Sequence, residues 1–160
     1  MAENSACGQR VGRPRPGEDP EDEIGRDMAP DKGPVAPKGH TRLRVMVLED
    51  EPLAAMALDD MLVDLGFITL GPFMELDDAT DFVRDHAAEI DVAILDVNIH
   101  GDLSFDLAAL LHQRNIPFFF CSGYSKEAFD PRWRRWPNLG KQYSEARLTA
   151  MIEEACGVRA

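Results

Sequence analysis

The chain has 160 residues, of which 44% are hydrophobic and 29% charged, as expected for one globular domain. No apolar run approaches the roughly 18 residues that cross a membrane, and no signal peptide is evident, so neither membrane insertion nor secretion is expected. Seventeen basic against 29 acidic residues give a net charge of −12, which disfavours nucleic-acid partners. The cysteines Cys7, Cys121 and Cys156 form no closely spaced pair, which favours a reducing, cytoplasmic setting.

The first 40 residues differ in composition from the rest. Glycine and proline make up 12 of these 40 positions, and apolar periodicity is almost absent. Such a segment buries too little surface to offset the entropy of ordering. The composition therefore predicts a disordered, Gly/Pro-rich tail over residues 1–40 and a single domain over residues 41–158.

Apolar residues then alternate between strand-like runs and helical spacing. A strand is predicted over 43–48, a helix from Pro52 to its end at Gly66, and a strand over 67–73. The next predictions are a helix over 76–87, a strand over 92–95 and a helix that includes Leu103, Leu107 and Leu111.

The C-terminal part continues the pattern less regularly. A strand is predicted over 117–121, a poorly periodic stretch over 125–136, a short strand near Leu139 and a helix over 148–155. Alternating strands and helices indicate a parallel sheet covered on both faces. The predicted fold is α/β, a doubly wound, flavodoxin-like (βα)5 sheet of strand order 2-1-3-4-5 with a short or irregular fourth helix.

Polar residues whose side chains can bind ligands or react follow the predicted strands. Glu49 and Asp50 follow the first strand, Asp96 the third and Ser122 the fourth, while Lys141 lies near the fifth. Ligands of open α/β sheets bind at these strand ends.

Carboxylates gathered there repel one another unless a hard cation such as Mg²⁺ (or Mn²⁺) joins them. A lysine and a hydroxyl suit a phosphoryl group, so the pattern predicts Mg²⁺-assisted phosphoryl transfer to a carboxylate.

The segments Val47–Pro52, Ala93–Asn98 and Phe120–Gly123, together with Lys141, resemble the receiver domain of two-component response regulators. The resemblance spans about residues 42–157. The run from Ile116 to Tyr124 is similar to the stand-alone receivers of alphaproteobacteria, in which this strand typically reads Phe-Ala-Thr-Gly.

The resemblance implies a role for each matching position. Asp96 corresponds to the phosphoacceptor, and Glu49 and Asp50 to the acidic pair that organises Mg²⁺. Asn98 corresponds to the residue whose backbone carbonyl completes the metal ligands.

Further positions match the family residues that contact the phosphoryl group. Ser122 corresponds to the switch hydroxyl and Lys141 to the lysine that pairs with the phosphoryl group. Asn98 and Tyr124 border the path of the hydrolytic water, where they are expected either to tune the phosphoryl lifetime or only to pack. The donor would be a phosphohistidine of a histidine kinase or phosphotransfer protein.

Two positions depart from the family pattern. Gln142 follows the lysine where proline is usual, so a trans peptide bond is expected and the placement of Lys141 is open. Asn138 stands where an aromatic switch residue is common, which removes the usual aromatic rotation.

The sequence Arg132, Trp133, Arg134, Arg135, Trp136 is the one basic cluster of the predicted domain. Tryptophan and arginine are frequent in protein interfaces, so this segment predicts partner docking. The competing interpretation is core packing of the tryptophans with solvated arginines.

The leading hypothesis is a single-domain receiver in phosphorelay signalling rather than an enzyme. Because the chain ends soon after the last predicted helix, its output is expected to be binding of a downstream protein, or transfer or storage of phosphate. A phosphorylation-independent pseudo-receiver is one alternative. A haloacid-dehalogenase-like Mg²⁺ phosphohydrolase is the other, although Asp96 and Asn98 do not form the Asp-x-Asp pair of that class.

Overall fold

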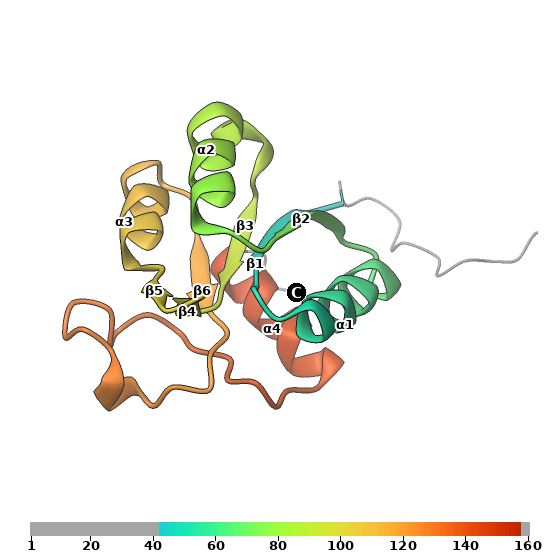
Figure 1. The fold of residues 1–160 in the computed structure, drawn as a ribbon. Coiled ribbons are helices and arrows are strands. Elements are labelled where there is room, and N and C mark those ends of the chain that lie inside the picture. The colour runs from blue at the N-terminus through green and yellow to red at the C-terminus, as the bar shows by residue number, and fades with distance from the viewer. Residues whose placement is uncertain (1–41, 158–160) are drawn as a thin grey trace, which may run out of the picture. The chain divides into compact units, whose positions relative to one another are not determined.

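The computed structural model describes residues 42–157. The N-terminal tail predicted over residues 1–40 lies outside this range. The elements, in chain order, are β1 (Arg44–Leu48), α1 (Pro52–Asp64), β2 (Ile68–Phe73), α2 (Leu76–His86), η1 (Ala87–Glu89), β3 (Val92–Leu95), β4 (Asn98–Ile99), β5 (Asp102–Leu103), α3 (Phe105–Gln113), β6 (Phe118–Phe120), η2 (Lys126–Ala128) and α4 (Glu145–Ala155) (Figure 1).

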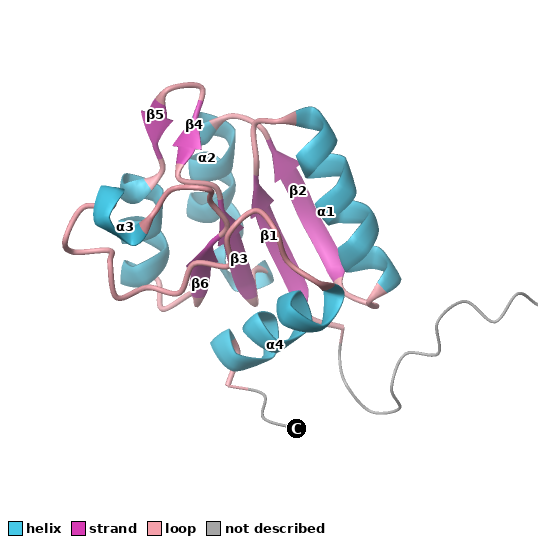
Figure 2. Ribbon diagram, turned by 90° about the horizontal axis from the view of Figure 1, so that it is seen from below, coloured by secondary structure: helices cyan, strands magenta, loops and turns pink. Residues whose placement is uncertain are grey.

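Four parallel strands form the sheet, in the order β2-β1-β3-β6 (Figure 2). Central strands β1 and β3 pair in register from Val45 with Val92 to Leu48 with Leu95. The order confirms the doubly wound, flavodoxin-like prediction, with β6 as the fourth strand of the sheet. Because all four strands run in the same direction, their carboxyl ends lie at one edge.

Two hydrophobic layers cover the two faces of the sheet. Helices α2 and α3 pack on one face, while α1 and α4 pack on the other (Figure 1). The alternation of side chains along a strand divides the three phenylalanines of β6 between these layers. Phe118 and Phe120 face the α2–α3 layer, and Phe119 faces the α1–α4 layer.

The fifth strand of the prediction is reduced to one bridge. Asn138 pairs in parallel with Phe120, and the Leu139 N–H donates to the Phe120 carbonyl at 2.8 Å. The chain then turns at Gly140, whose φ of +78° takes it out of the strand conformation.

Leu103 is not in the third helix as predicted. It belongs to the antiparallel hairpin β4–β5, and its side chain is exposed. Helix α3 begins two residues later at Phe105, so the apolar spacing placed the start of the helix at least two residues too early.

The prediction that the fourth helix is short or irregular is confirmed. Between β6 and α4 the structure has only the short 3₁₀ turn η2. Aromatic side chains fill the space instead: Phe129 and Trp133 are buried against Phe105 and Phe120, and Trp136 stacks on Phe118 with ring centroids 5.8 Å apart. None of the helices within residues 42–157 has the length and apolar character needed to span a bilayer.

Candidate functional site

The polar residues predicted at the strand ends meet at one edge of the sheet. Ligand oxygens of Glu49, Asp50 and Asp96 lie within 4.8 Å of one another. Lys141 reaches them from the loop before α4, forming ion pairs with Glu49 and, at 3.2 Å, with Asp96 Oδ2. Ser122 follows β6 at the same edge. The parallel sheet therefore gathers residues separated by up to 92 positions.

Asp96 is almost fully buried and firmly held. Its Oδ1 accepts the Val97 N–H at 2.7 Å, and its backbone carbonyl accepts the Ser104 hydroxyl at 2.6 Å. Ser104 is itself buried directly before α3, and its N–H donates to the Val97 carbonyl. The hairpin β4–β5 thus returns to anchor the aspartate. Because one carboxylate oxygen is engaged by the backbone, Oδ2 is the oxygen that faces Lys141.

Glu49 and Lys141 form the electrostatic centre of the site. Burial raises the pKa of the Glu49 carboxyl, although the hydrogen bond from Lys141 opposes this effect. Burial lowers the pKa of Lys141, but the bond to Glu49 and the charge of Asp96 outweigh it and raise the pKa to about 12. Lys141 is therefore a permanent cation at neutral pH.

The charge of the cluster fits a divalent cation. Three carboxylates and one ammonium group leave a net charge of −2. The donors are carboxylate oxygens, which Mg²⁺ prefers, and Asp50 is still partly open to solvent. Glu49, Asp50 and Asp96 thus satisfy the donor chemistry and the charge that Mg²⁺ or Mn²⁺ requires.

Asp50 is also held by the loop that follows β4. Its Oδ2 accepts the His100 N–H at 2.9 Å, and the His100 ring lies 3.5 Å from the same oxygen. The second ring nitrogen of His100 is 3.3 Å from Glu75. The left-handed backbone of His100, with φ of 53°, makes this approach possible.

Gln142 stands where the family pattern has proline, and Lys141 nevertheless reaches the carboxylates. The Lys141–Gln142 peptide bond is trans, as expected, and Lys141 still reaches Asp96. The side-chain stem of Lys141 runs past Gly123, where an added Cβ would lie 3.8 Å from the lysine Cγ.

Ser122 is buried beside the carboxylates with its hydroxyl oxygen accepting the Tyr124 N–H at 3.2 Å. The hydroxyl proton remains able to donate to a ligand. Asp96, Asn98, Ser122, Gly123, Tyr124 and Lys141 line an open hollow of about 320 Å³. A larger hollow of about 530 Å³ lies at the opposite ends of the strands, beside Pro117 and Trp136, and contains none of these groups.

Tyr124 and Asn98 meet across the mouth of this hollow. The Asn98 amide donates to the Tyr124 hydroxyl at 3.1 Å, and its Oδ1 accepts the Gly101 N–H at 2.8 Å. Tyr124 is about half exposed, with a relative accessibility of 47%. The predicted pair therefore lies together at the solvent side of Asp96.

The segment from Arg132 to Trp136 is only partly available to a partner. Trp133 is buried in the α2–α3 layer and Trp136 is half-buried, so the packing interpretation holds for the tryptophans. Arg132 pairs with Asp130, and Arg134 donates to the Phe129 and Glu127 carbonyls. The Trp133 indole is covered in the folded chain, which favours core packing for this residue, and docking through the exposed arginines of the segment stays a prediction.

Two residues of the site were missed by the sequence reasoning. Ser104 anchors the Asp96 backbone, and the amide of Asn138 makes four hydrogen bonds around Ser122. The predicted helix included Leu103, so Ser104 fell inside it and its side chain was given no role. Nothing in the local pattern around Asn138 indicates the second.

No protein-family model and no curated protein sequence matches the chain. Solved structures do. The solution structure of SdrG from Sphingomonas melonis Fr1 is 35% identical, covering 71% of this chain and 98% of that chain, with a TM-score of 0.62. The BeF3-activated conformation of SdrG, from Pseudomonas melonis Fr1, is 34% identical over 75% of this chain and 100% of that chain, with a TM-score of 0.61.

A more distant match is the PhyR response regulator REC domain of Erythrobacter litoralis. It is 23% identical and covers 74% of this chain and 92% of that chain, with a TM-score of 0.62. At this identity the likeness concerns the fold alone.

Proposed function

The chain belongs to the response regulator receiver family, and from this premise we propose that it accepts a phosphoryl group on Asp96 from a phosphohistidine. The observation that carries the proposal is the joint placement of Asp96, Lys141 and the acidic pair at one sheet edge. The donor is a histidine kinase or a histidine phosphotransfer protein, and the receiver acts in phosphorelay signalling.

Asp96 Oδ2 is the nucleophile, because Oδ1 is held by the Val97 N–H. A bond forms between Oδ2 and phosphorus while the bond from phosphorus to the donor imidazole nitrogen breaks. The leaving imidazole takes up a proton, and an aspartyl phosphate remains. Lys141, protonated at neutral pH, balances the charge of the phosphoryl oxygens, and the Ser122 hydroxyl donates to one of them.

Glu49, Asp50, Asp96 and the Asn98 backbone carbonyl would hold Mg²⁺ (or Mn²⁺). The bound ion would neutralise charge on the phosphoryl oxygens. Asn98 and Tyr124 border the approach of water to Asp96, and their hydrogen bond supports a role in setting the phosphoryl lifetime.

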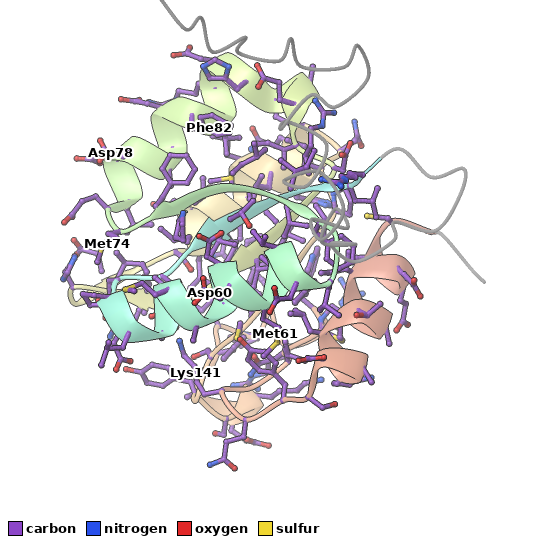
Figure 3. All side chains as sticks on the ribbon, turned by 90° about the vertical axis from the view of Figure 1, so that its right-hand side faces the viewer. Asp60, Met61, Met74, Asp78, Phe82 and Lys141 are labelled. Carbon is purple, nitrogen blue, oxygen red and sulfur yellow. The ribbon has the colours of Figure 1, made fainter. Side chains whose placement is uncertain are left out.

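The first two turns of α1 provide a surface for the donor. Leu53 and Met56 are exposed, at 76% and 62%, on the helix that begins directly after Glu51. An exposed apolar surface next to a phosphoacceptor suits a transient protein contact. Figure 3 shows α1 across the view, with Lys141 below it.

Intact mass spectrometry after incubation with Mg²⁺ and acetyl phosphate tests the phosphoacceptor. One phosphoryl adduct is expected for the wild type and for Asp60→Asn, which alters an exposed carboxylate on α1. No adduct is expected for Asp96→Ala or in chelator. If neither acetyl phosphate nor beryllofluoride modifies the wild type, the chain is a phosphorylation-independent adaptor and the proposal fails.

Docking is tested by transfer from a phosphorylated donor. Leu53→Ser and Met56→Ser are expected to slow this transfer while leaving the reaction with acetyl phosphate unchanged. Val63→Ser is the matched control, because Val63 is also exposed but lies about 15 Å further along α1 than Leu53. Equal slowing by all three variants would argue against a local docking surface.

A further inference from the structure

The side-chain amide of Asn138 joins two loops of the site. Its Oδ1 accepts the Ser122 N–H at 3.1 Å and the Gly140 N–H at 3.2 Å. Its Nδ2 donates to the Ser122 carbonyl and to the Tyr124 carbonyl, both at 3.3 Å. One side chain therefore contacts the loop that carries Ser122 and the turn that carries Lys141.

The reason lies in the incomplete fifth strand. Backbone groups of alternate residues point to the open side of β6, and those of Phe120 are paired with Pro137 and Leu139. The next outward pair belongs to Ser122, but the main chain has by then turned away at Gly140. The Asn138 amide has a carbonyl and N–H groups, as a peptide group does, so it takes the place of the missing strand.

We propose that Asn138 is a positioning residue that sets the Ser122 hydroxyl and the Lys141 ammonium relative to Asp96. The proposal rests on the proposed function, because its effect on phosphorylation requires Asp96 to be the acceptor. Oδ1 holds the Ser122 N–H and the N–H of the residue directly before Lys141 on a single atom. The two phosphoryl-binding groups are thereby fixed at one spacing.

This role requires an amide and not only a side chain that fills space. Leucine branches at the same carbon as asparagine, carries methyl groups in place of the amide oxygen and nitrogen, and offers no hydrogen bonds. Aspartate keeps an oxygen that accepts both N–H groups, but it loses the donor side and adds a negative charge next to the Ser122 and Tyr124 carbonyls. Asn138→Leu and Asn138→Asp therefore separate the two halves of the interaction, and the aspartate variant carries the test if the leucine variant does not fold.

The rate of Mg²⁺-dependent adduct formation with acetyl phosphate is the first measurement. Asn138→Leu is expected to lower the rate about tenfold, and Asn138→Asp to lower it less. Gln113→Leu, which removes an exposed primary amide at the end of α3, is the matched control and should leave the rate unchanged. A folded Asn138→Leu protein with the wild-type rate would overturn the proposal.

A double-mutant cycle distinguishes positioning from general stabilisation of the loop. In a Ser122→Ala background there is no hydroxyl to position, so replacing Asn138 should cost clearly less than it does in the wild type. Full additivity of the two losses would overturn the proposal, because it would mean that Asn138 acts independently of Ser122.

Amide hydrogen exchange tests the hydrogen bonds of the Asn138 amide, which we call the Asn138 clamp, without phosphorylation. In Asn138→Leu the Ser122 and Gly140 amide protons are expected to exchange at least about tenfold faster, while those of the central strand β3 keep their protection. If the wild type forms no adduct, the proposed function fails, but this measurement still decides whether the clamp exists. Unchanged protection of both amides would overturn the proposal even if phosphorylation is confirmed.

Discussion

Removing the buried indole of Trp133 should destabilise the domain strongly. The side chain is 6% exposed and packs against Phe105, Phe118, Phe120 and Trp136, with ring centroids 4.9–6.4 Å away. Truncating such a residue to alanine costs about 3–5 kcal/mol, which is a large part of the roughly 5–15 kcal/mol that stabilises a domain.

One polar atom reduces the loss of stability expected for Trp133→Ala. The Trp133 indole N–H is buried without a hydrogen-bond partner among the described residues, an arrangement that costs about 1–3 kcal/mol. We therefore expect Trp133→Ala near the lower end, about 3 kcal/mol. Trp133→Phe should cost less than about 1.5 kcal/mol, because it keeps a ring in the cluster and removes the unpaired donor.

Urea unfolding at 25 °C, followed by circular dichroism, measures these differences. The exposed Arg135 supplies the control, since Arg135→Ala should change the free energy of unfolding by no more than about 0.5 kcal/mol. A loss below about 1 kcal/mol for Trp133→Ala, with an unchanged m-value, would refute the packing of this residue. It would return the Arg132–Trp136 segment to the docking interpretation.

Three other outcomes follow from the site and its surroundings. Tyr124→Ala should shorten the lifetime of the aspartyl phosphate, measured as decay of the mass adduct after donor removal, and an unchanged lifetime would leave Tyr124 with a packing role only. Lys141→Met should destabilise the chain by about 1–3 kcal/mol in chelator, because the carboxylates lose their cation. In thermal unfolding, Mg²⁺ should stabilise this variant more than the wild type. Equal stabilisation of the two proteins by Mg²⁺ would contradict the charge argument. The hydrogen bond from Arg44 lowers the pKa of Asp91 below its usual 3.8, so its stabilising contribution is present above about pH 4 and lost as the pH falls through the folded-state pKa. Asp91→Asn should therefore weaken the fold at pH 7 by an amount that shrinks below about pH 4, and a pH-independent difference would contradict this assignment.

The central strands could be predicted because their sequences permit little else. Val92–Leu95 has four apolar residues without a polar break, which suits a strand covered on both sides, and the structure places β3 at these positions. Helix α1 begins at Pro52 and ends before Gly66, as the local conformational preferences of these residues predict. The strand-end positions of Glu49, Asp50 and Asp96 then follow from the parallel topology.

The irregular segments around β5 and after β6 could not be predicted from local preferences in the same way. Leu139 contributes a single buried residue, and its pairing depends on hydrogen bonds to Phe120, which lies 19 positions earlier. The spacing of Leu103 fits a helix, yet a hairpin forms because Ser104 bonds back to Asp96 and Val97. The amide of Asn138 acts across the fold, so a sequence pattern registers it only as a missing aromatic residue.

The flank beyond β6 is joined by ring contacts and a side-chain amide where a helix would offer repeating backbone bonds. Two arrangements of such a flank can differ by small amounts of free energy, since passing between them disrupts at most the short 3₁₀ turn η2. A preference of only about 1.4 kcal/mol changes their ratio tenfold, which is within reach of one added phosphoryl group. The scarcity of regular structure between Ser122 and Trp136 thus means that a rearrangement at this end of the sheet would require little input of free energy.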